Sequence, residues 1–302
     1  MTITKPTIPN APHKKEAAKK PLPFTMRRRR PHKVELYVAF FWFGLIVFAA
    51  VAADWLPLRN FEASEGPARL APFANPNWIL GTDQLGRDVL ARLVYGARVS
   101  LIVSVSAVVV GMIVGGLLGA TAGYLRGKVE VIFNIIIDSA LAFPPLILLL
   151  AVTAVLTPSL PSLTAALTLL TIPAFARLAR AGTLPLRNRE FVQAAKSMGA
   201  RDGRIIVKEI LPSVTPSLMA YGFVVAATVI VAEGSLSFLG LGIPPPAPSW
   251  GGMIANSRSL LAQAPWLIFL PAVALVLTVH SLNVIGNWAR ELAEAPTKSK
   301  GA

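Results

Sequence analysis

The chain has 302 residues, of which 54% are hydrophobic and 15% charged, and its mean hydropathy of +0.60 excludes an ordinary water-soluble domain and predicts an integral membrane protein. Cysteine is absent and the three histidines (His13, His32 and His280) are scattered, so disulfides and a clustered metal site are not expected. The net charge of +14 fits either nucleic-acid binding or a membrane protein with its basic residues on one side, and the position of these charges decides between them.

Residues 1–33 are rich in Pro, Lys and Arg and include the run Arg27-Arg28-Arg29-Arg30. Such a leader is expected to be disordered. A basic run can bind nucleic acid or anionic lipid, but directly before an apolar span it is typical of a segment retained on the cytoplasmic side. The uncharged residues 36–53 predict the first transmembrane helix.

Residues 55–97 are polar and end in an amphipathic stretch that starts at Thr82-Asp83. Leu85, Val89 and Leu93 recur at every fourth position in it, which predicts a helix lying at the outer membrane interface rather than a span. Residues 34–98 therefore comprise the first span and an external segment.

The second span is predicted at residues 99–122. Its glycines Gly111, Gly115 and Gly119 recur every four residues, a spacing that lets another helix approach closely. The partner is a helix of the same chain or of another subunit.

The third span, residues 131–157, contains Asp138 and is broken by Pro144-Pro145. A carboxylate on a broken helix is typical of a transport path. The alternative is that Asp138 pairs with a basic residue of a neighbouring loop.

Three more spans complete the prediction. The fourth, residues 163–176, is the weakest and is long enough only if Arg177 and Arg180 extend their charges outward. The fifth, residues 213–232, ends at Glu233, and the sixth, residues 266–286, holds His280 and Asn283. Between these two, residues 250–261 predict a short re-entrant helix, so residues 99–290 form the core and residues 291–302 a polar tail.

Residues 190–212 are the one polar segment deep inside this apolar core. A helix is predicted up to Met198, ended by Gly199 in the left-handed conformation. Asp202 is expected to cap a second short helix, which buries one isoleucine face and ends at Pro212. The isoleucines are Ile205, Ile206 and Ile210.

The charges test this six-span topology. Segments assigned to the cytoplasmic side carry 23 of the 29 Lys and Arg residues and those outside carry 6. By the positive-inside rule both termini and residues 190–212 are cytoplasmic, and the net charge reflects topology rather than nucleic-acid binding.

The pattern Ala194-Ala195, Gly199 and Leu211-Pro212 resembles the cytoplasmic EAA loop of permease subunits of binding-protein-dependent ABC importers. Two positions differ from that family: Gln193 replaces its leading acid and Glu209 replaces an isoleucine, so Glu190, one turn earlier, is the candidate substitute. Residues 81–88, 234–245 and 248–251 are similar to the second permease subunit of the peptide and nickel group. Together the similarities run from about residue 36 to 296.

This resemblance implies an all-α type I importer permease in the inner membrane, paired with a paralogous permease, two ATPase subunits and a solute-binding protein. No cofactor is expected in this chain, because Gly127-Lys128 is followed by Val129 and does not complete a phosphate-binding loop; ATP and magnesium belong to the partners. The chain is thus expected to be non-catalytic, with peptides (oligopeptide or dipeptide) favoured over nickel complexes as cargo. The loop 185–212 is implied to contact the ATPase through Glu190, Gln193, Ala194, Ala195, Met198, Gly199, Ala200, Arg201 and Asp202.

The candidates for the translocation path or its gate are polar residues and breaks within the spans. For each, a role in helix packing or capping is the alternative. They are Asp138, Pro144, Pro145, Glu233, His280 and Asn283. A secondary transporter, or an accessory membrane subunit not powered by ATP, is the rival function.

Overall fold

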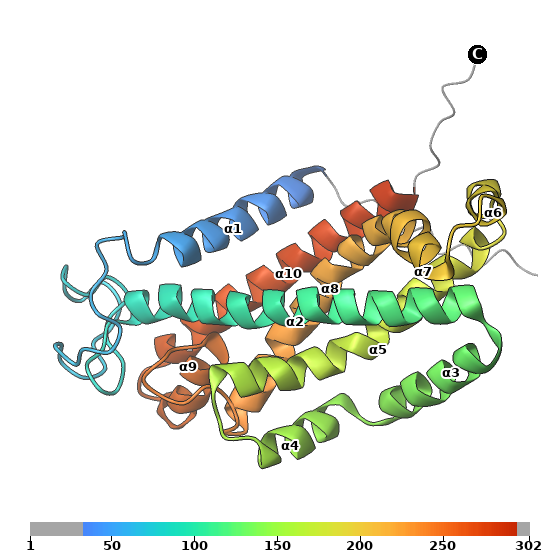
Figure 1. Cartoon of the computed structure of the whole chain (residues 1–302). Coiled ribbons are helices and arrows are strands. Elements are labelled where there is room, and N and C mark those ends of the chain that lie inside the picture. Colours follow the sequence, from blue (N-terminus) through green and yellow to red (C-terminus); the bar gives the residue numbers. More distant parts are fainter. Residues whose placement is uncertain (1–32, 295–302) are drawn as a thin grey trace, which may run out of the picture. The chain divides into compact units, whose positions relative to one another are not determined.

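The computed structural model describes residues 33–294, which fold into helices joined by turns (Figure 1). Most of the predicted leader and residues 295–302 of the predicted tail lie outside the described residues. In chain order the elements are α1 (Lys33–Ala52), α2 (Val89–Leu125), α3 (Gly127–Ala142), α4 (Pro145–Val155), α5 (Leu160–Leu186), α6 (Glu190–Ser197), α7 (Asp202–Ile205), the π-helical turn η1 (Ile206–Ile210), α8 (Leu211–Phe238), α9 (Trp250–Ser257), the 3₁₀ turn η2 (Arg258–Leu260) and α10 (Trp266–Glu294).

Five helical stretches of the described chain are long and apolar enough to cross a membrane. These are α1, α2, α5, the continuous stretch from α7 through α8, and α10. The pair α3 and α4 makes a sixth if it is counted as one span, and it bends by 90° at the predicted Pro144-Pro145 break. Pro144 has no N–H to donate and Phe143 before it is extended, which is why the helix cannot continue. The all-helical fold with up to six spans is confirmed.

The glycine stripe of α2 faces α5 of the same chain. A Cβ atom at Gly111, Gly115 or Gly119 would overlap Thr171, Ile172 or Ala176 of α5, so the two backbones approach as closely as glycine permits. The sequence allowed the packing partner of the glycine stripe to be a helix of this chain or of another subunit, and the structure shows that it is α5 of this chain.

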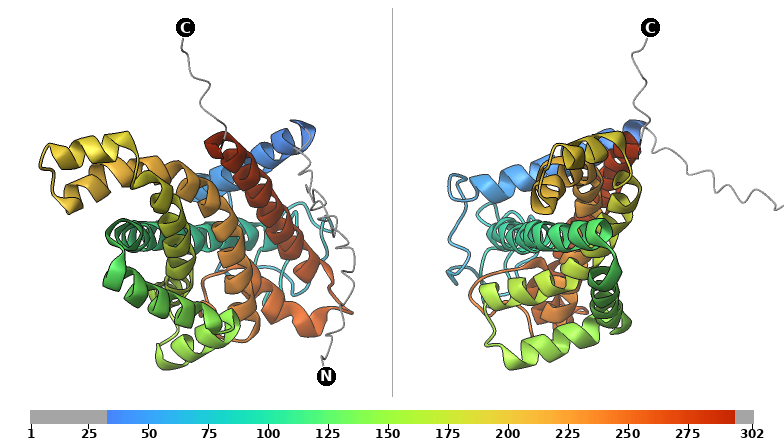
Figure 2. Two further views of the ribbon diagram at one scale, coloured as in Figure 1. Left: turned by 90° about the vertical axis from the view of Figure 1, so that its right-hand side faces the viewer. Right: turned by 45° about the vertical axis from the view of Figure 1, so that its right-hand side comes forward.

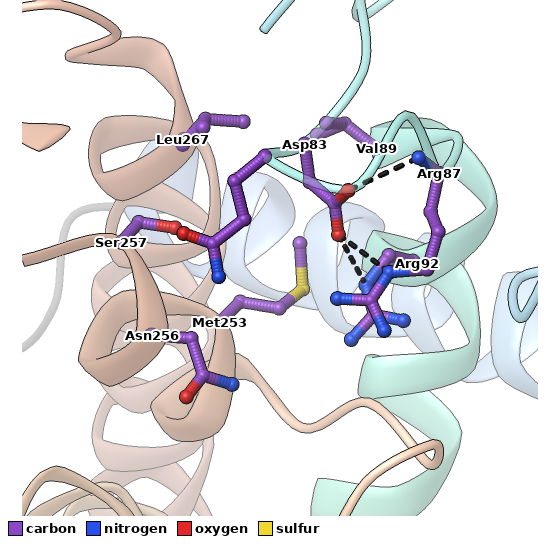
Figure 3. Close-up of a pocket in the computed structure, with 9 residues that line it drawn as sticks. Asp83, Arg87, Val89, Arg92, Met253, Asn256, Ser257 and Leu267 are labelled. Atoms are coloured by element: carbon purple, nitrogen blue, oxygen red, sulfur yellow. Dashed lines mark hydrogen bonds and ion pairs between the residues drawn. The ribbon is translucent and has the colours of Figure 1, made fainter. Parts of the chain in front are cut away.

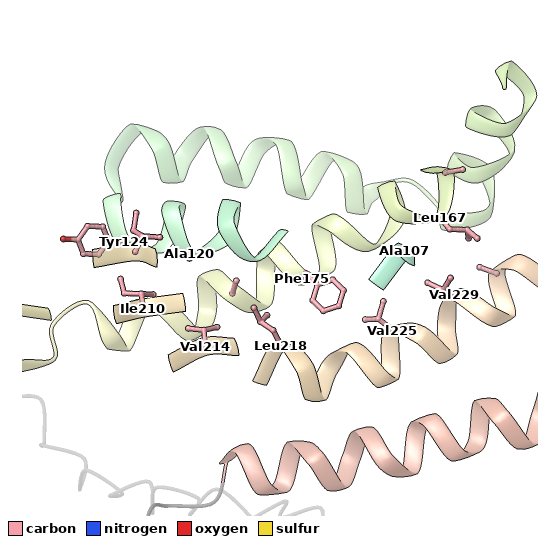
Figure 4. Close-up of a cluster of buried hydrophobic side chains, with 14 of the residues drawn as sticks. Ala107, Ala120, Tyr124, Leu167, Phe175, Ile210, Val214, Leu218, Val225 and Val229 are labelled. Carbon is pink, nitrogen blue, oxygen red and sulfur yellow. The ribbon is translucent and has the colours of Figure 1, made fainter. Parts of the chain in front are cut away.

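The main core fills the space between α2, α5 and α8 (Figure 4). Phe175 of α5 stacks edge-on against Tyr221 of α8, with ring centroids 5.6 Å apart. The core continues to the turn after α7, where Ile205, Ile206 and Ile210 are buried as their spacing predicts. The residue 190–212 segment is thus anchored in the same core as the spans.

The predicted interfacial helix starting at Thr82 is not present. Residues 82–88 form a turn, and Asp88 accepts hydrogen bonds from the backbone of Leu90 and Ala91 to begin α2, which runs without a break for 37 residues. The apolar residues at every fourth position led to a wrong prediction because they do not belong to one helix. Leu85 is exposed in the turn, whereas Val89 is the first residue of α2. The expected boundary at residue 98 consequently falls inside α2.

Pro212 does not end the second short helix of the 190–212 segment. The chain passes from α7 through η1 into α8 with Pro212 in its first turn. The wider π-helical turn just before it relieves the clash between a proline ring and the preceding turn. A continuous helical rod therefore joins the bend at Gly199 to the fifth span.

The fourth span was predicted too short. α5 covers 27 residues, Leu160–Leu186, and contains both Arg177 and Arg180. Each of the two arginines pairs with an acidic residue of α3. Because their charges are paired in this way, both arginines lie within the helix and not in the loop that follows it.

Candidate functional site

The bend between α6 and α7 is a complete Schellman motif. Gly199 has φ +78°, its N–H donates to Lys196, and the N–H of Ala200 donates to Ala195 at 3.1 Å. The predicted left-handed role of Gly199 is confirmed. Val192 and Ala195 are buried on the inner side of α6, which fixes the direction in which the bend projects.

Asp202 has a different role from the one predicted. Arg201 precedes α7 as its N-cap without a side-chain bond, and Asp202 instead accepts a hydrogen bond from the Tyr124 hydroxyl at 3.1 Å. This bond crosses from the end of α2 to the start of α7. The bend is therefore tied to α2 as well as to α8.

The outer face of the bend is exposed. Met198 at its tip is 80% exposed, and Figure 2 shows α6 and α7 projecting from the helices around them. Beside it a hollow of about 240 Å³ is lined by both charge signs, including Arg187, Lys196 and Asp202. A projection with a capped helix and an exposed apolar tip can be bound by another protein. Among the other residues predicted to contact the ATPase, Ala195 is buried and Ala200 half-buried, and the rest are exposed: Glu190, Gln193, Ala194, Gly199, Arg201 and Asp202.

Two ion pairs join α3 to α5. Arg177 donates to Asp138 at 2.6 Å, and Arg180 donates to Glu130 nearer the start of α3. The partner of Asp138 is thus in a helix rather than in a loop. Pro144 and Pro145 are exposed next to this face.

The remaining path candidates lie elsewhere. Glu233 is 1% exposed inside the bundle and accepts hydrogen bonds from Ser100 at 3.3 Å and Ser237 at 2.8 Å. His280 lies 3.6 Å from Glu35 between α10 and α1, and Asn283 donates to Val279 of its own helix. The structure does not gather the six candidates into one site.

A second polar cluster lies at the end of the helices opposite the bend. Asp83 accepts from Arg87 Nε at 2.7 Å and pairs with Arg92 at 3.6 Å, and Met253 and Asn256 of α9 line the same small pocket (Figure 3). Sequence reasoning treated these charges as interfacial. Their dense spacing within residues 83–92 was the available signal for a buried cluster.

The family described as binding-protein-dependent transport system inner membrane component matches residues 111–297, more than half of the chain. The chain belongs to this family. It is therefore a permease component of an ABC importer, located in the inner membrane and crossing it several times. This assignment favours the importer over the rival secondary transporter or ATP-independent subunit.

Relatives of 34% to 38% identity extend the match to about four fifths of this chain. The dipeptide transport system permease of Alkalihalophilus pseudofirmus is 36% identical over 85% of this chain and 86% of its own length. The di/tripeptide permease of Pseudomonas aeruginosa is 34% identical, covering 84% and 86%, and the glutathione permease of Pectobacterium atrosepticum is 38% identical, covering 78% and 76%. The predicted resemblance to permeases of peptide-type systems is confirmed.

Solved structures support the fold alone. Two crystal forms of the inward-facing MetNI methionine ABC transporter match with TM-scores of 0.55 and 0.57 at 19% identity. They cover 67% and 68% of this chain and 96% and 97% of the matched chain. The type I importer architecture predicted for the permease is therefore confirmed.

Proposed function

We propose that this permease forms half of the translocation path of an ATP-driven importer for peptides, either oligopeptides or dipeptides. The support for this cargo is that relatives of 34% to 38% identity are named as permeases of dipeptide, di/tripeptide and glutathione systems. Nickel complexes are the alternative cargo. Both termini face the cytoplasm, as the excess of Lys and Arg in the segments on that side indicates.

The partners follow from what the chain lacks and what it presents. Its sequence contains no phosphate-binding loop, so ATP and magnesium bind to two partner ATPase subunits. A paralogous permease supplies the other half of the path, and a solute-binding protein delivers the peptide from outside.

The observation that carries the proposal is the rigid projection of the α6–α7 bend. Met198 offers an exposed apolar tip, while Val192 and Ile205 hold the base of the bend in the core. A load applied at the tip passes through η1 into α8 and through the Asp202–Tyr124 bond into α2. Glu190, exposed at the start of α6, supplies the acid that Gln193 lacks.

The mechanism is alternating access. ATP-driven closure of the ATPase subunits moves the bends of the two permeases together, and the rods attached to them tilt. The cavity between the permeases then opens outward to receive the peptide, and hydrolysis returns it to the inward-open state. The ATP-bound ATPase subunits must bind the outward-open and the inward-open permease with different affinities. Only such a difference shifts the populations of these two states.

Single-cysteine variants test the docking, since the natural chain has no cysteine. Met198→Cys is expected to cross-link to an ATPase subunit in the assembled transporter, and its reactivity toward a membrane-impermeant maleimide appears only from the cytoplasmic side. Trp55→Cys is the matched control. Trp55 is 83% exposed, about as much as Met198, but it follows the C-terminal end of α1, which the proposed topology puts on the outer side of the membrane. Reaction of the Met198→Cys variant from the outside contradicts the proposal, and so does cross-linking of the Trp55→Cys variant to the ATPase without cross-linking of the Met198→Cys variant.

The cargo is tested in proteoliposomes that contain both permeases, the ATPase subunits and the binding protein. We expect ATP-dependent accumulation of a labelled dipeptide. Accumulation of a nickel complex without any peptide uptake overturns the peptide assignment while leaving the importer assignment intact.

A further inference from the structure

The Asp138–Arg177 pair lies in the middle of two apolar helices. At a rise of about 1.5 Å per residue, Asp138 is roughly 16 Å from the start of α3 at Gly127. By the same measure Arg177 is roughly 14 Å from the end of α5 at Leu186. Both charges are thus several turns inside their helices, and charges within membrane-spanning helices are costly and mark substrate or ion pathways.

The two ion pairs between α3 and α5 differ in their surroundings. The side chains of Glu130 and Arg180 are 20% and 25% exposed, which fits a pair that holds the helices together. Those of Asp138 and Arg177 are 65% and 59% exposed. A face that presents such charges at this depth must be covered by water or by the second permease rather than by lipid tails.

The charged face lies beside the break in the helix. α3 ends at Ala142, four residues after Asp138, and the chain turns by 90° into α4. A break of this kind lets α3 move against α5 as a hinged element. Such a movement separates the carboxylate from the guanidinium and leaves both free for other partners.

We infer that Asp138 and Arg177 form a binding site for the two charged ends of a zwitterionic peptide. The carboxylate of Asp138 accepts hydrogen bonds from the peptide ammonium, and the planar guanidinium of Arg177 binds the peptide carboxylate through two parallel bonds. A dipeptide is at most about 7 Å long, so with a hydrogen bond of about 2.8 Å at each end it bridges the pair once the two side chains have separated to about 12 Å or less. This inference rests on the proposed function, in which a peptide moves along this face.

The experiment uses the complete transporter in proteoliposomes with its binding protein and ATP. One dipeptide is supplied in three forms: unmodified, amidated at the carboxyl end, and acetylated at the amino end. Each form is used at a concentration that saturates the same binding protein, so the preference of that protein is the same for every permease variant.

The two neutral variants are expected to change opposite preferences. Arg177→Gln lowers the ratio of unmodified to amidated uptake by about tenfold and leaves the ratio of unmodified to acetylated uptake unchanged, because only the carboxylate contact is lost. Asp138→Asn does the converse. Glu130→Gln, which disturbs the neighbouring pair, reduces uptake of all three forms by the same factor.

A conservative variant is tested in case a neutral variant does not assemble into the transporter. Assembly is measured by the amount of ATPase subunit that co-purifies with the permease. Arg177→Lys keeps the charge and loses the paired geometry, so the amide ratio is expected to fall by about threefold. If Arg177→Gln does not assemble, an unchanged ratio in Arg177→Lys overturns the inference.

Equal loss of all three forms in both neutral variants also overturns it, because the pair then acts only as a clasp between α3 and α5. In that outcome the unaltered transporter still imports the peptide and the proposed function stands. If the unaltered transporter imports none of the three forms, the proposed function fails and this inference fails with it.

Discussion

Glu233 shows how a polar residue serves the fold of a membrane protein. Its two carboxylate oxygens accept bonds from Ser100 of α2 and Ser237 of α8, and the side chain has almost no contact with solvent. The bond from Ser100 joins α2 to α8, whereas Ser237 lies one turn from Glu233 in α8 itself. A hydrogen bond between helices adds specificity where apolar contacts alone give little. The geometry supports a packing role more strongly than contact with a passing solute.

Replacement of Glu233 tests that role. Glu233→Ala leaves two buried hydroxyl groups without their partner, and each unpaired group costs about 1–3 kcal/mol. A lower melting temperature of the detergent-purified complex is expected. Glu233→Gln keeps an acceptor of the same size and is expected to lose less, so equal melting temperatures for the two variants contradict the role.

Gly119 illustrates the close contact between α2 and α5. A Cβ added here meets the carbonyl of Ala176 and the side chain of Ala179, so Gly119→Ala forces the helices apart at a cost of about 1–3 kcal/mol. Gly44→Ala on α1 is the control, because nothing lies within 4 Å of its Cβ position. Thermal unfolding is expected to show destabilisation for Gly119→Ala and none for Gly44→Ala, since alanine favours helix more than glycine does.

At the scale of elements, the bend and the spans act as one body because three links join them. The backbone joins the bend to α5 through residues 187–189 and to α8 through η1, and the Tyr124–Asp202 hydrogen bond joins it to α2. Without that hydrogen bond the bend could move on its two backbone links without moving α2. The three links together transmit both displacement and rotation to the bundle.

Tyr124→Phe removes the hydrogen bond that joins the bend to α2 and leaves both backbone links in place. Asp202 is exposed and can bond water instead, so the bond is worth about 1 kcal/mol and the peptide transported per ATP hydrolysed is expected to fall by about fivefold while ATP hydrolysis continues. Ser213→Ala, which also removes one hydroxyl, is the control, because Ser213 only bonds Glu209 of the preceding turn. Equal transport per ATP in the two variants would rule out the link.

At the scale of the whole molecule, the two ends of the helices carry different structures. The α6–α7 bend projects from one end, and the segment 53–88 lies beside α9 at the other, where Asp83 and Arg87 line one small pocket with Met253 and Asn256 (Figures 1 and 3). The α3–α5 face with its charged pair lies between them. In the proposed alternating-access cycle, this face is exposed to the two sides of the membrane in turn.

Ser139→Cys reports that alternation, because Ser139 is exposed next to Asp138. In the nucleotide-free transporter we expect labelling by an impermeant maleimide from the cytoplasmic side only. In the ATP-bound, vanadate-trapped transporter we expect labelling from the outside only. Labelling from the same side in both states contradicts the proposed cycle, and Gly44→Cys on α1 serves as the control that is expected to label in neither.

The sequence by itself determined the features that depend on a residue and its near neighbours. Long apolar runs predict the spans, Pro144-Pro145 predicts the broken helix, and Gly199 predicts the left-handed bend, because backbone restriction and transfer into the membrane are local properties. The motif around Ala194-Ala195 also identified the family.

Only the tertiary structure decided which side chains meet. In it the glycine stripe packs against α5, Asp202 accepts a hydrogen bond from Tyr124, and Asp138 pairs with Arg177. Glu233 is buried, and the helical stretch that begins with α7 continues past Pro212. Each of these contacts joins residues far apart in the chain or depends on a backbone adjustment that such packing stabilises. The free energy that selects a partner belongs to the packed bundle and not to any single stretch of sequence.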